Sequence, residues 1–336
     1  MDLKTLTEIN APSGHEQALR RALVEELKGM RLEPTIDRMG NVVVVKPGYG
    51  LEPRKRVLLS AHMDEVGLIV TSATEDGFLK VTTAGGIDPR VVVSKRVLVG
   101  DDKIPGIIGA VAIHLQSAAD RKHVLGFREL SVDIGAKSKD EAESKAPKGT
   151  YISFDTEYVE YGDGYACGKA FDDRVGILNL LRVLEDDYPV DIVAVFASEE
   201  EVGCRGAKGA AFAQEPDIGI ILEGTTCNDL GDVPETQHVC KTGEGVCVSF
   251  MDGASIANRD LFKKTLEVGR ARGIRHQVKN GTSGGNEGGV VQRARGGIPT
   301  VVLSVPCRYI HSPSSVIKLS DVKSQLDLTK ALLKAL

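Results

Sequence analysis

From residue 171 onward, strand-like apolar segments alternate with helix-like amphipathic segments, and this alternation constrains the fold more than any other feature. The apolar segments VDIVAVFA, DIGIILE and TVVLSV are separated by stretches with helical periodicity, and a further helix is expected from about residue 320. Elements that alternate in this way build a sheet with helices packed on both of its faces. The sequence therefore predicts an α/β fold.

The N-terminal part of the chain contributes a helix and two more strands. Ser13 and Glu16 fit the pattern of a capping box, which predicts a helix over about residues 14–30. Short runs of apolar residues at 42–45 and 57–60 predict two buried strands. These strands are expected to join the same sheet.

The middle of the chain has a different pattern. Between about residues 71 and 162, short β-type runs are broken by Gly, Pro and Asp, with one helical piece, DEAESKA, near position 140. We expect a small β domain inserted after the second strand of the sheet. The predicted organisation is one α/β domain formed by 1–65 and 163–336, with a β domain inserted at 66–162.

Composition narrows the functional classes. The net charge of -5 at pH 7 gives no electrostatic basis for binding nucleic acid or a membrane surface. Apolar runs stay well short of the roughly 20 residues of a membrane span, and the first residues do not resemble a signal peptide. The six cysteines form no CxxC pair, which disfavours a disulfide framework. We therefore expect a cytoplasmic protein with no nucleic-acid or membrane partner.

Acidic and histidine residues follow the predicted strands. His62 and Asp64 are two residues apart, so on a strand their side chains share a face. A histidine that binds a metal needs a partner for its second ring nitrogen, and Asp64 can supply one. By itself, however, such a pair is more typical of an ordinary surface contact.

Two further acidic groups have similar positions. Asp172 and Asp173 stand where a helix begins, and such carboxylates either cap the helix or bridge two metal ions. Three consecutive acids, 199–201, follow the apolar segment VDIVAVFA, where they repel one another unless cations compensate them. A solvated acidic loop is the alternative interpretation of this group.

Glu223 ends the segment DIGIILE, and His311 follows TVVLSV within RYIHSP. Each residue alone could be structural, but ligands bind at the carboxyl ends of strands in open α/β sheets. Oxygen and nitrogen ligands without sulfur suit zinc, cobalt or manganese. Two such ions can activate water for hydrolysis, with a free carboxylate as the general base. The combined pattern predicts metal-assisted hydrolysis.

Five motifs in order, AHMDEVG, GKAFDDRVG, EEVGCRGA, LEGTT and RYIHSP, resemble the co-catalytic metallo-aminopeptidases of the tetrahedral, glutamyl and deblocking type. The resemblance covers essentially the whole chain. It implies a phosphorylase/hydrolase-like mixed sheet sandwiched by helices, with an inserted β-barrel-like domain. It also implies release of N-terminal residues from peptides, with two divalent ions per subunit.

The resemblance further implies a set of five metal ligands, namely His62, Asp172, Glu201, Glu223 and His311. In this scheme Asp172 bridges the two ions. The pair His62 and Glu223 belongs to one ion, and the pair Glu201 and His311 belongs to the other.

The same resemblance makes Glu200 the catalytic base and gives Asp64 the task of orienting His62. Because the acids are consecutive, aligning the motif EEVG leaves Glu199 outside the site. A shift of one residue in this alignment would change which acid is the base and which is the ligand.

The sequence departs from the family pattern in two places. Many members have Asp where this chain has Glu223, and many have a GGTDAG-like loop where this chain has GGNEGG at 284–289. The motif LEGTT resembles the branch historically labelled cellulase M or endoglucanase. Preference for the N-terminal side chain stays open, as does the role of Glu287.

Three other functions compete with the aminopeptidase. An endoglucanase would use two carboxylates without metal ligands and would need aromatic platforms for sugars, but this chain has no tryptophan and only 4% aromatic residues. A related dinuclear carboxypeptidase or N-acyl amino acid deacylase would use similar ligands. A non-catalytic scaffold is disfavoured by the intact Glu200.

The family resemblance also implies a homo-oligomer, with a dodecamer as the expected size. Two runs of the insert, VVVSKRVLV and IPGIIGAVAI, combine apolar character with β propensity. Strands with exposed edges are safer when they are paired or covered. We therefore expect the insert to make much of the subunit contact.

Overall fold

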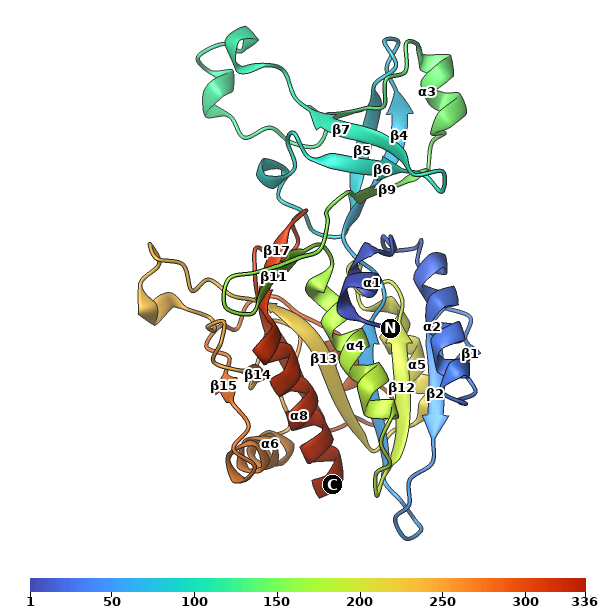
Figure 1. Ribbon diagram of the computed structural model, residues 1–336, viewed down its shortest axis with the longest axis vertical. Helices are drawn as coiled ribbons and strands as arrows, with labels where there is room; N and C mark the ends of the chain where they lie inside the picture. The colour runs from blue at the N-terminus through green and yellow to red at the C-terminus, as the bar shows by residue number, and fades with distance from the viewer.

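A mixed sheet of eleven strands forms the centre of the larger of two bodies in the computed structural model (Figure 1). The structure describes residues 1–336, except for the side chain of Asp120. The sheet runs in the order β1 (Thr35–Ile36), β2 (Val42–Lys46), β12 (Asp191–Ala197), β3 (Arg56–His62), β13 (Ile218–Thr226), β16 (Thr300–Arg308), β17 (Ser315–Lys318), β11 (Tyr165–Gly168) and β10 (Val159–Tyr161). Strands β14 (Val246–Ser249) and β15 (His276–Val278) extend it beside β16.

The central strands share one direction. Strands β12 and β13 both pair in parallel with β3, and β16 pairs in parallel with β13. Strand β11 also runs this way, because it is antiparallel to β17, which is antiparallel to β16. Their carboxyl ends therefore meet at one edge of the sheet, where open α/β sheets bind ligands.

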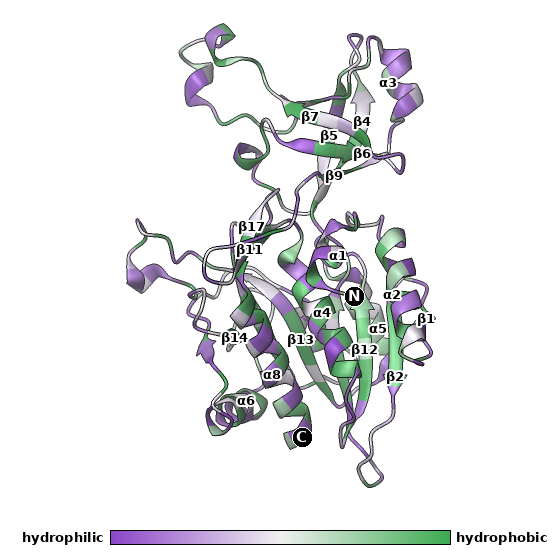
Figure 2. Cartoon of the chain, viewed as in Figure 1, coloured by the Kyte–Doolittle hydropathy of each residue, from purple (hydrophilic) through white to green (hydrophobic). Residues whose placement is uncertain are grey.

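Helices cover both faces of the sheet, and the predicted mixed α/β sandwich with an inserted β-barrel is confirmed. One face packs against α2 (Gln17–Gly29), α4 (Phe171–Leu184), α6 (Arg259–Ala271) and α8 (Leu319–Ala335). The other face packs against α5 (Arg205–Gln214) and α7 (Gly288–Val291), and α1 (Leu3–Glu8) contacts α4. Figure 2 shows β2 and β12 as largely hydrophobic and α8 with alternating hydrophobic and hydrophilic residues. Every helix within the described residues is too short or too polar to cross a membrane.

The smaller body is a closed barrel, in the order β4 (Gly67–Ala73), β5 (Leu79–Ala84), β8 (Ser131–Asp133), β7 (Ile104–Gly109), β6 (Arg96–Val99) and β9 (Tyr151–Phe154). Its one α-helix, α3 (Lys139–Lys145), matches the predicted helical piece near position 140. Short 3-10 turns lie at Pro89–Val91, Ile113–Leu115 and Asp120–Lys122, and a fourth, Glu235–Gln237, lies in the larger body. Strand β10 belongs to the large sheet, although it lies inside the predicted segment 66–162. The exact domain boundaries stay a prediction.

The barrel strands of the insert are paired within the barrel itself. Both apolar runs lie in the barrel region, and barrel closure pairs each strand with two neighbours, which removes free edges. A case for subunit contacts must therefore rest on other features of the barrel.

The predicted capping box is also wrong. Helix α2 begins at Gln17, with Glu16 at the N-cap position. The Ser13 hydroxyl donates to the carboxylate of Asp64 at 2.7 Å, and Glu16 accepts from the backbone N–H of Gly14 at 2.7 Å. The local sequence pattern suggested that Ser13 caps the helix, but its hydroxyl instead donates to Asp64, which is 51 residues away in the sequence.

Candidate metal centre

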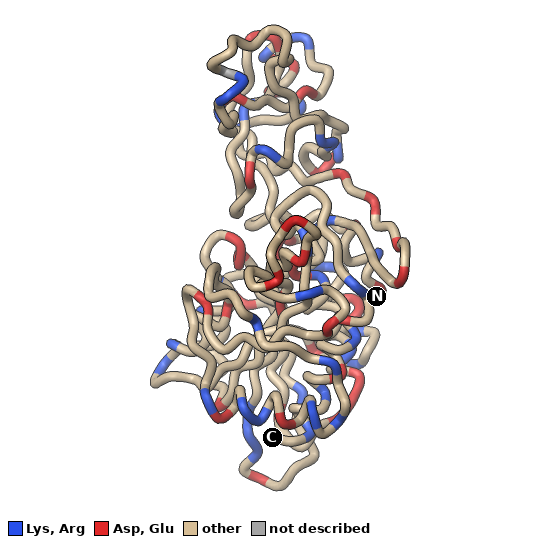
Figure 3. Tube along the Cα trace, turned by 90° about the vertical axis from the view of Figure 1, so that its left-hand side faces the viewer, with Lys and Arg blue, Asp and Glu red and all other residues tan. Residues whose placement is uncertain are grey.

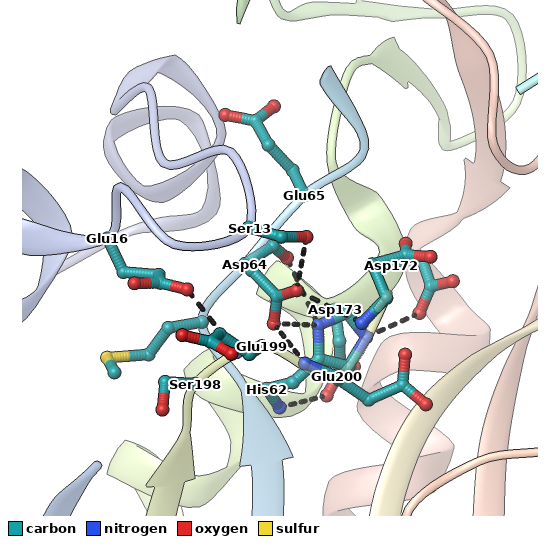
Figure 4. A network of polar contacts seen from close by, with 12 residues as sticks. Ser13, Glu16, His62, Asp64, Glu65, Asp172, Asp173, Ser198, Glu199 and Glu200 are labelled. Atoms are coloured by element: carbon teal, nitrogen blue, oxygen red, sulfur yellow. Dashed lines mark hydrogen bonds and ion pairs between the residues drawn. The ribbon is translucent and has the colours of Figure 1, made fainter. Parts of the chain in front are cut away.

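Histidine and carboxylate side chains converge at the carboxyl edge of the sheet (Figure 4). His62 is the last residue of β3, Asp172 lies at the start of α4, and Glu200 and Glu201 follow β12. His311 follows β16. Figure 3 shows acidic residues gathered where the barrel meets the larger body.

Two strands end later than the sequence suggested. Strand β13 continues to Thr226, so Glu223 lies within the strand rather than at its end. Strand β16 continues to Arg308, and His311 follows after a short turn. The main chain of β13 and β16 stays paired through these extra residues, from Gly224 with Val305 to Thr226 with Cys307. This continued backbone pairing explains why β13 and β16 extend beyond their expected ends.

The carboxylate of Asp172 lies between two histidines. Its Oδ1 is 3.3 Å from Nε2 of His62, which is also 3.7 Å from Oε2 of Glu223. Its Oδ2 is 3.5 Å from Nε2 of His311, which is 3.2 Å from Oε2 of Glu201. The five residues that the sequence singled out as ligands therefore form two groups that share Asp172.

These separations fit ligands of a shared metal ion, and as hydrogen bonds most of them are long. Good N–H···O hydrogen bonds measure about 2.7–3.2 Å, and three of the four distances exceed that range. Ligands at about 2.0–2.2 Å from a tetrahedral ion lie roughly 3.4 Å apart. In addition, Oε1 of Glu223 is buried and has no hydrogen-bond partner among the described residues. The donor set therefore fits divalent metal ions.

Asp173 has a different environment from its neighbour. Its Oδ2 accepts from the backbone N–H of His62 at 3.1 Å, and its Oδ1 accepts from the backbone N–H of Gly176 at 3.0 Å. Asp173 lies near His62 and Glu223, close enough to form a possible metal group with them. Because its oxygens already accept two backbone hydrogen bonds, it acts as an anchor between β3 and α4.

The buried charges shift the protonation of the site. Burial raises the pKa of Glu223 well above its usual range, and burial raises the pKa of Glu201 to about 8. Burial alone would lower the pKa of His62, but hydrogen bonds to Asp172 and Asp64 raise it well above its ordinary value. In the metal-free protein, bound protons thus offset the negative charge of the buried acids, a task that cations would otherwise perform.

Asp64 does more than the sequence suggested. Nδ1 of His62 lies 3.1 Å from the backbone oxygen of Asp64 and 3.4 Å from its carboxylate, in keeping with the expected orienting contact. The carboxylate also accepts the backbone N–H of Glu200 at 2.9 Å and that of Glu201 at 3.0 Å. Asp64 therefore links the end of β3 to the acidic turn after β12.

Glu199 lies outside the cluster, as the motif alignment predicted. Its side chain pairs with Arg205 at 3.1 Å and is one quarter exposed. Its φ of 55° is left-handed, which turns its side chain away from that of Glu200. The sequence could not reveal this turn.

Glu287 is a buried acid whose role the sequence left open. It is fully buried, and its Oε2 accepts from the hydroxyl of Ser60, two residues before His62. Burial raises the pKa of Glu287 to about 8, so it is largely protonated near neutral pH in the metal-free protein. In the sequence, the loop GGNEGG differs from the loop of many family members, and this difference pointed to Glu287 without indicating its role.

The barrel forms one wall of the site. Gly85 approaches the side chain of Glu201 so closely that an added Cβ would lie 3.2 Å from it, and an added Cβ on Gly86 would lie 3.7 Å from Nδ1 of His311. A pocket beside these residues is lined by Val66 and Phe154 from the barrel side and by Phe171 from the larger body, among others. The candidate site therefore lies between the barrel and the larger body.

Comparison with known proteins decides the family. The sequence matches the profile of the M42 glutamyl aminopeptidase family over residues 40–328, which is most of the chain. The chain belongs to the M42 family. Membership makes it a hydrolase that acts on peptide bonds, and a family of metallopeptidases implies divalent metal ions at the His/Asp/Glu cluster.

Individual M42 relatives agree with this assignment. The lysyl aminopeptidase of Pyrococcus furiosus is 30% identical, with 99% of this chain and 96% of the relative covered. The aminopeptidase APDkam598 of Desulfurococcus kamchatkensis has a structure with a TM-score of 0.94 at 31% identity, covering 99% and 94% of the two chains. This chain is similar to both along its whole length.

Two further M42-like structures carry other information in their names. PhTET1-12s, a dodecamer, has a TM-score of 0.87 at 30% identity, covering 99% and 98% of the chains. A Thermotoga maritima protein named endoglucanase has a TM-score of 0.82 at 31% identity, covering 100% and 97%. The second name matches the branch label that the motif LEGTT suggested.

Proposed function

We propose that this M42 enzyme releases N-terminal residues from peptides with two divalent metal ions held by His62, Asp172, Glu201, Glu223 and His311. The observation that carries the proposal is the shared carboxylate of Asp172, whose two oxygens face two different histidines. His62 and Glu223 would hold one ion, His311 and Glu201 the other, and Asp172 would bridge them. We propose zinc or cobalt, with manganese as a possible substitute, because the ligands are imidazole and carboxylate.

Glu200 is the proposed general base. Two divalent ions would supply an acidified water and a polarised scissile carbonyl. Glu200 would accept the proton of the attacking water and pass it to the leaving amine. Burial, together with the charge of Asp172, raises the pKa of Glu200, which makes its carboxylate a stronger base than an exposed one. Oε1 of Glu200 already accepts a hydrogen bond from Sγ of Cys204 at 3.1 Å, which orients it.

The charges around the site favour recognition of a free N-terminus. A carboxypeptidase needs a cation to bind the substrate carboxylate, but Lys169 is paired with both oxygens of Glu65 at 2.8 Å. Arg174 is fully buried and donates to backbone oxygens, including those of Leu6 and Met63. Neither of these basic side chains near Asp172 is available to bind a substrate carboxylate.

A panel of blocked peptides tests this function. We expect peptides with a free N-terminus to lose residues one at a time from that end, and N-acetylated copies of the same peptides to resist. The product analysis is by mass spectrometry. Release from the carboxyl end, or cleavage of the acetyl group, would instead support the dinuclear carboxypeptidase or N-acyl amino acid deacylase. Soluble cellulose in the same panel tests the endoglucanase label, and we expect no cleavage of it.

We also propose that the enzyme is a cytoplasmic homo-oligomer, with the dodecamer as the expected size. The cytoplasmic location rests on the six cysteines, all of which are free thiols. The proposal of an oligomer is based on the similarity to PhTET1-12s and on exposed apolar side chains in the connection from β7 to β8. Val111, Ile113 and Leu115 are 60%, 69% and 72% exposed, which is unusual for residues of this kind so close together.

Light scattering on the purified chain measures the assembly. We expect particles many times the 35.9 kDa chain mass. Replacing Ile113 and Leu115 by serine should give smaller particles, because it removes apolar surface from the contact. The matched control replaces the exposed apolar residues Tyr49 and Leu51 of the larger body, which should leave the size unchanged. A monomer at micromolar concentration would contradict the oligomer.

A further inference from the structure

The backbone of the acidic turn after β12 is held by carboxylates from elsewhere in the chain. The N–H of Glu199 donates to Oε1 of Glu16 at 3.3 Å. The N–H of Glu200 donates to Oδ1 of Asp64 at 2.9 Å, and that of Glu201 donates to Oδ2 of Asp64 at 3.0 Å. Three consecutive backbone donors therefore have carboxylate acceptors (Figure 4).

This turn needs such anchoring for two reasons. Glu199 has a left-handed backbone with φ of 55°, which is unfavourable for a residue with a side chain. Its neighbours Glu200 and Glu201 carry like charges into a buried site, so their side chains repel one another. The backbone must be fixed by other contacts if Glu200 is to keep one position.

The acceptor Asp64 is itself held in place by Ser13. Asp64 is fully buried, and its Oδ2 accepts the Ser13 hydroxyl at 2.7 Å in addition to the N–H of Glu201. Both oxygens of the Asp64 carboxylate therefore accept hydrogen bonds, and the Ser13 hydroxyl restrains the rotation of this carboxylate.

Ser13 is fixed in turn by a backbone pairing between residues 11–13 and Glu65. The N–H of Ser13 donates to the oxygen of Glu65 at 3.2 Å, and the N–H of Glu65 donates to the oxygen of Ala11 at 3.0 Å. The carboxylate of Glu65 accepts the N–H of Ala11 at 2.8 Å and the ammonium group of Lys169. Residues 11–16 are thus built into the wall behind the acidic turn.

From this geometry we propose that Ser13 is a positioning residue for the general base: its hydroxyl orients Asp64, and Asp64 fixes the backbone of Glu200 and Glu201. The proposal rests on the proposed function for the role of Glu200, but the contact chain from Ser13 to the turn does not. Ser13 touches neither the reacting atoms nor the candidate metal ligands, so its effect must pass through Asp64.

The test compares Ser13→Ala with Ser13→Thr, which keeps the hydroxyl, and with Ser324→Ala. Ser324 is a matched control, because it is a buried serine that accepts one backbone hydrogen bond and donates another on α8. We expect Ser13→Ala to lower kcat by about 10-fold, because small misplacement of a catalytic group is costly. KM and metal content should stay near the wild-type values, and Ser13→Thr should recover most of the loss.

A second measurement is independent of activity. Hydrogen–deuterium exchange of the peptide covering residues 198–204, followed by mass spectrometry, reports on the N–H groups of the turn. We expect faster exchange in Ser13→Ala than in wild type, and unchanged exchange in Ser324→Ala. Glu16→Ala, which removes the acceptor of the Glu199 N–H, is a positive control that should also speed exchange there. If Ser13→Ala folds poorly, Ser13→Cys replaces the hydroxyl by a weaker donor and should show the same changes in smaller measure.

The outcomes separate the two proposals. Equal kcat and equal exchange for Ser13→Ala and Ser324→Ala would overturn the role of Ser13. A wild-type enzyme that cleaves no peptide would overturn the proposed function, and the exchange measurement would still decide whether Ser13 holds the turn.

Discussion

Replacing Glu200 by glutamine is expected to remove most activity and to leave the metal content unchanged. The amide has nearly the same size as the carboxylate but cannot accept a proton, and loss of a general base costs about 10²–10⁴-fold in rate. The backbone contact from Glu200 to Asp64 is retained in this variant, since it uses the main-chain N–H. Steady-state kinetics and elemental analysis on the same preparation measure both effects.

The neighbouring acids provide matched controls for this experiment. Glu201→Gln should lower metal occupancy, because Oε2 of Glu201 faces His311 in the proposed second metal group. Glu199→Gln should leave both activity and metal content near wild type, because its side chain pairs with Arg205 away from the site. If the phenotypes of the Glu200 and Glu201 variants were exchanged, the assignment of base and ligand among the three acids would be wrong.

Removing the metal ions with a chelator is expected to abolish hydrolysis, and zinc or cobalt should restore it. Elemental analysis of the active enzyme should approach two ions per chain. An active preparation without metal would contradict the proposed mechanism. Magnesium alone serves as a control, because it prefers octahedral oxygen ligands and should restore little activity.

The metal-free protein should also become less stable as the pH rises. Burial raises the pKa of Glu201 from 4.5 to about 8. Burial would lower the pKa of His311, but its hydrogen bond to Asp172 and the charge of Glu201 raise it from 6.5 to about 9. Both folded-state pKa values exceed the unfolded ones, so the contributions of these two groups to the stability of the folded protein are complete at low pH. They are lost as the pH rises through about 8 for Glu201 and about 9 for His311.

Thermal unfolding of the chelated enzyme at pH 6, 7.5 and 9 measures this effect. The unfolding temperature should fall across the series, and added zinc should flatten the dependence because cations then balance the ionised acids. A metal-free enzyme that gains stability between pH 6 and 9 would show that the site is not dominated by these raised pKa values.

The sequence predicted the location of the site because the relevant signals are local. His62 follows its strand directly, and Glu200 and Glu201 come soon after β12. Each residue could be assigned to a strand end, and parallel strands bring such ends together. The family motifs then related these positions to one another, and the structure brings Asp172 and His311 to the same place.

The contacts that support the site could not be predicted in the same way. Ser13 and Glu16 match a capping box, and the rule that identifies such a box considers only residues within one turn of the helix. The actual partner of Ser13 is 51 residues away. Glu287 reaches Ser60 across 227 residues. Hydrogen bonds between distant segments depend on the tertiary fold, which one sequence does not reveal.

The barrel begins with β4 and ends with β9, and these two strands are hydrogen-bonded neighbours, with Leu68 opposite Ile152. The chain therefore leaves the larger body and returns to it at a single place. A block of this kind can be replaced without interrupting the sheet, because the large sheet contains none of the barrel strands. Since Gly85 and Gly86 of the same block face Glu201 and His311, a graft of this kind would change which peptide ends are admitted while every candidate metal ligand stays in place.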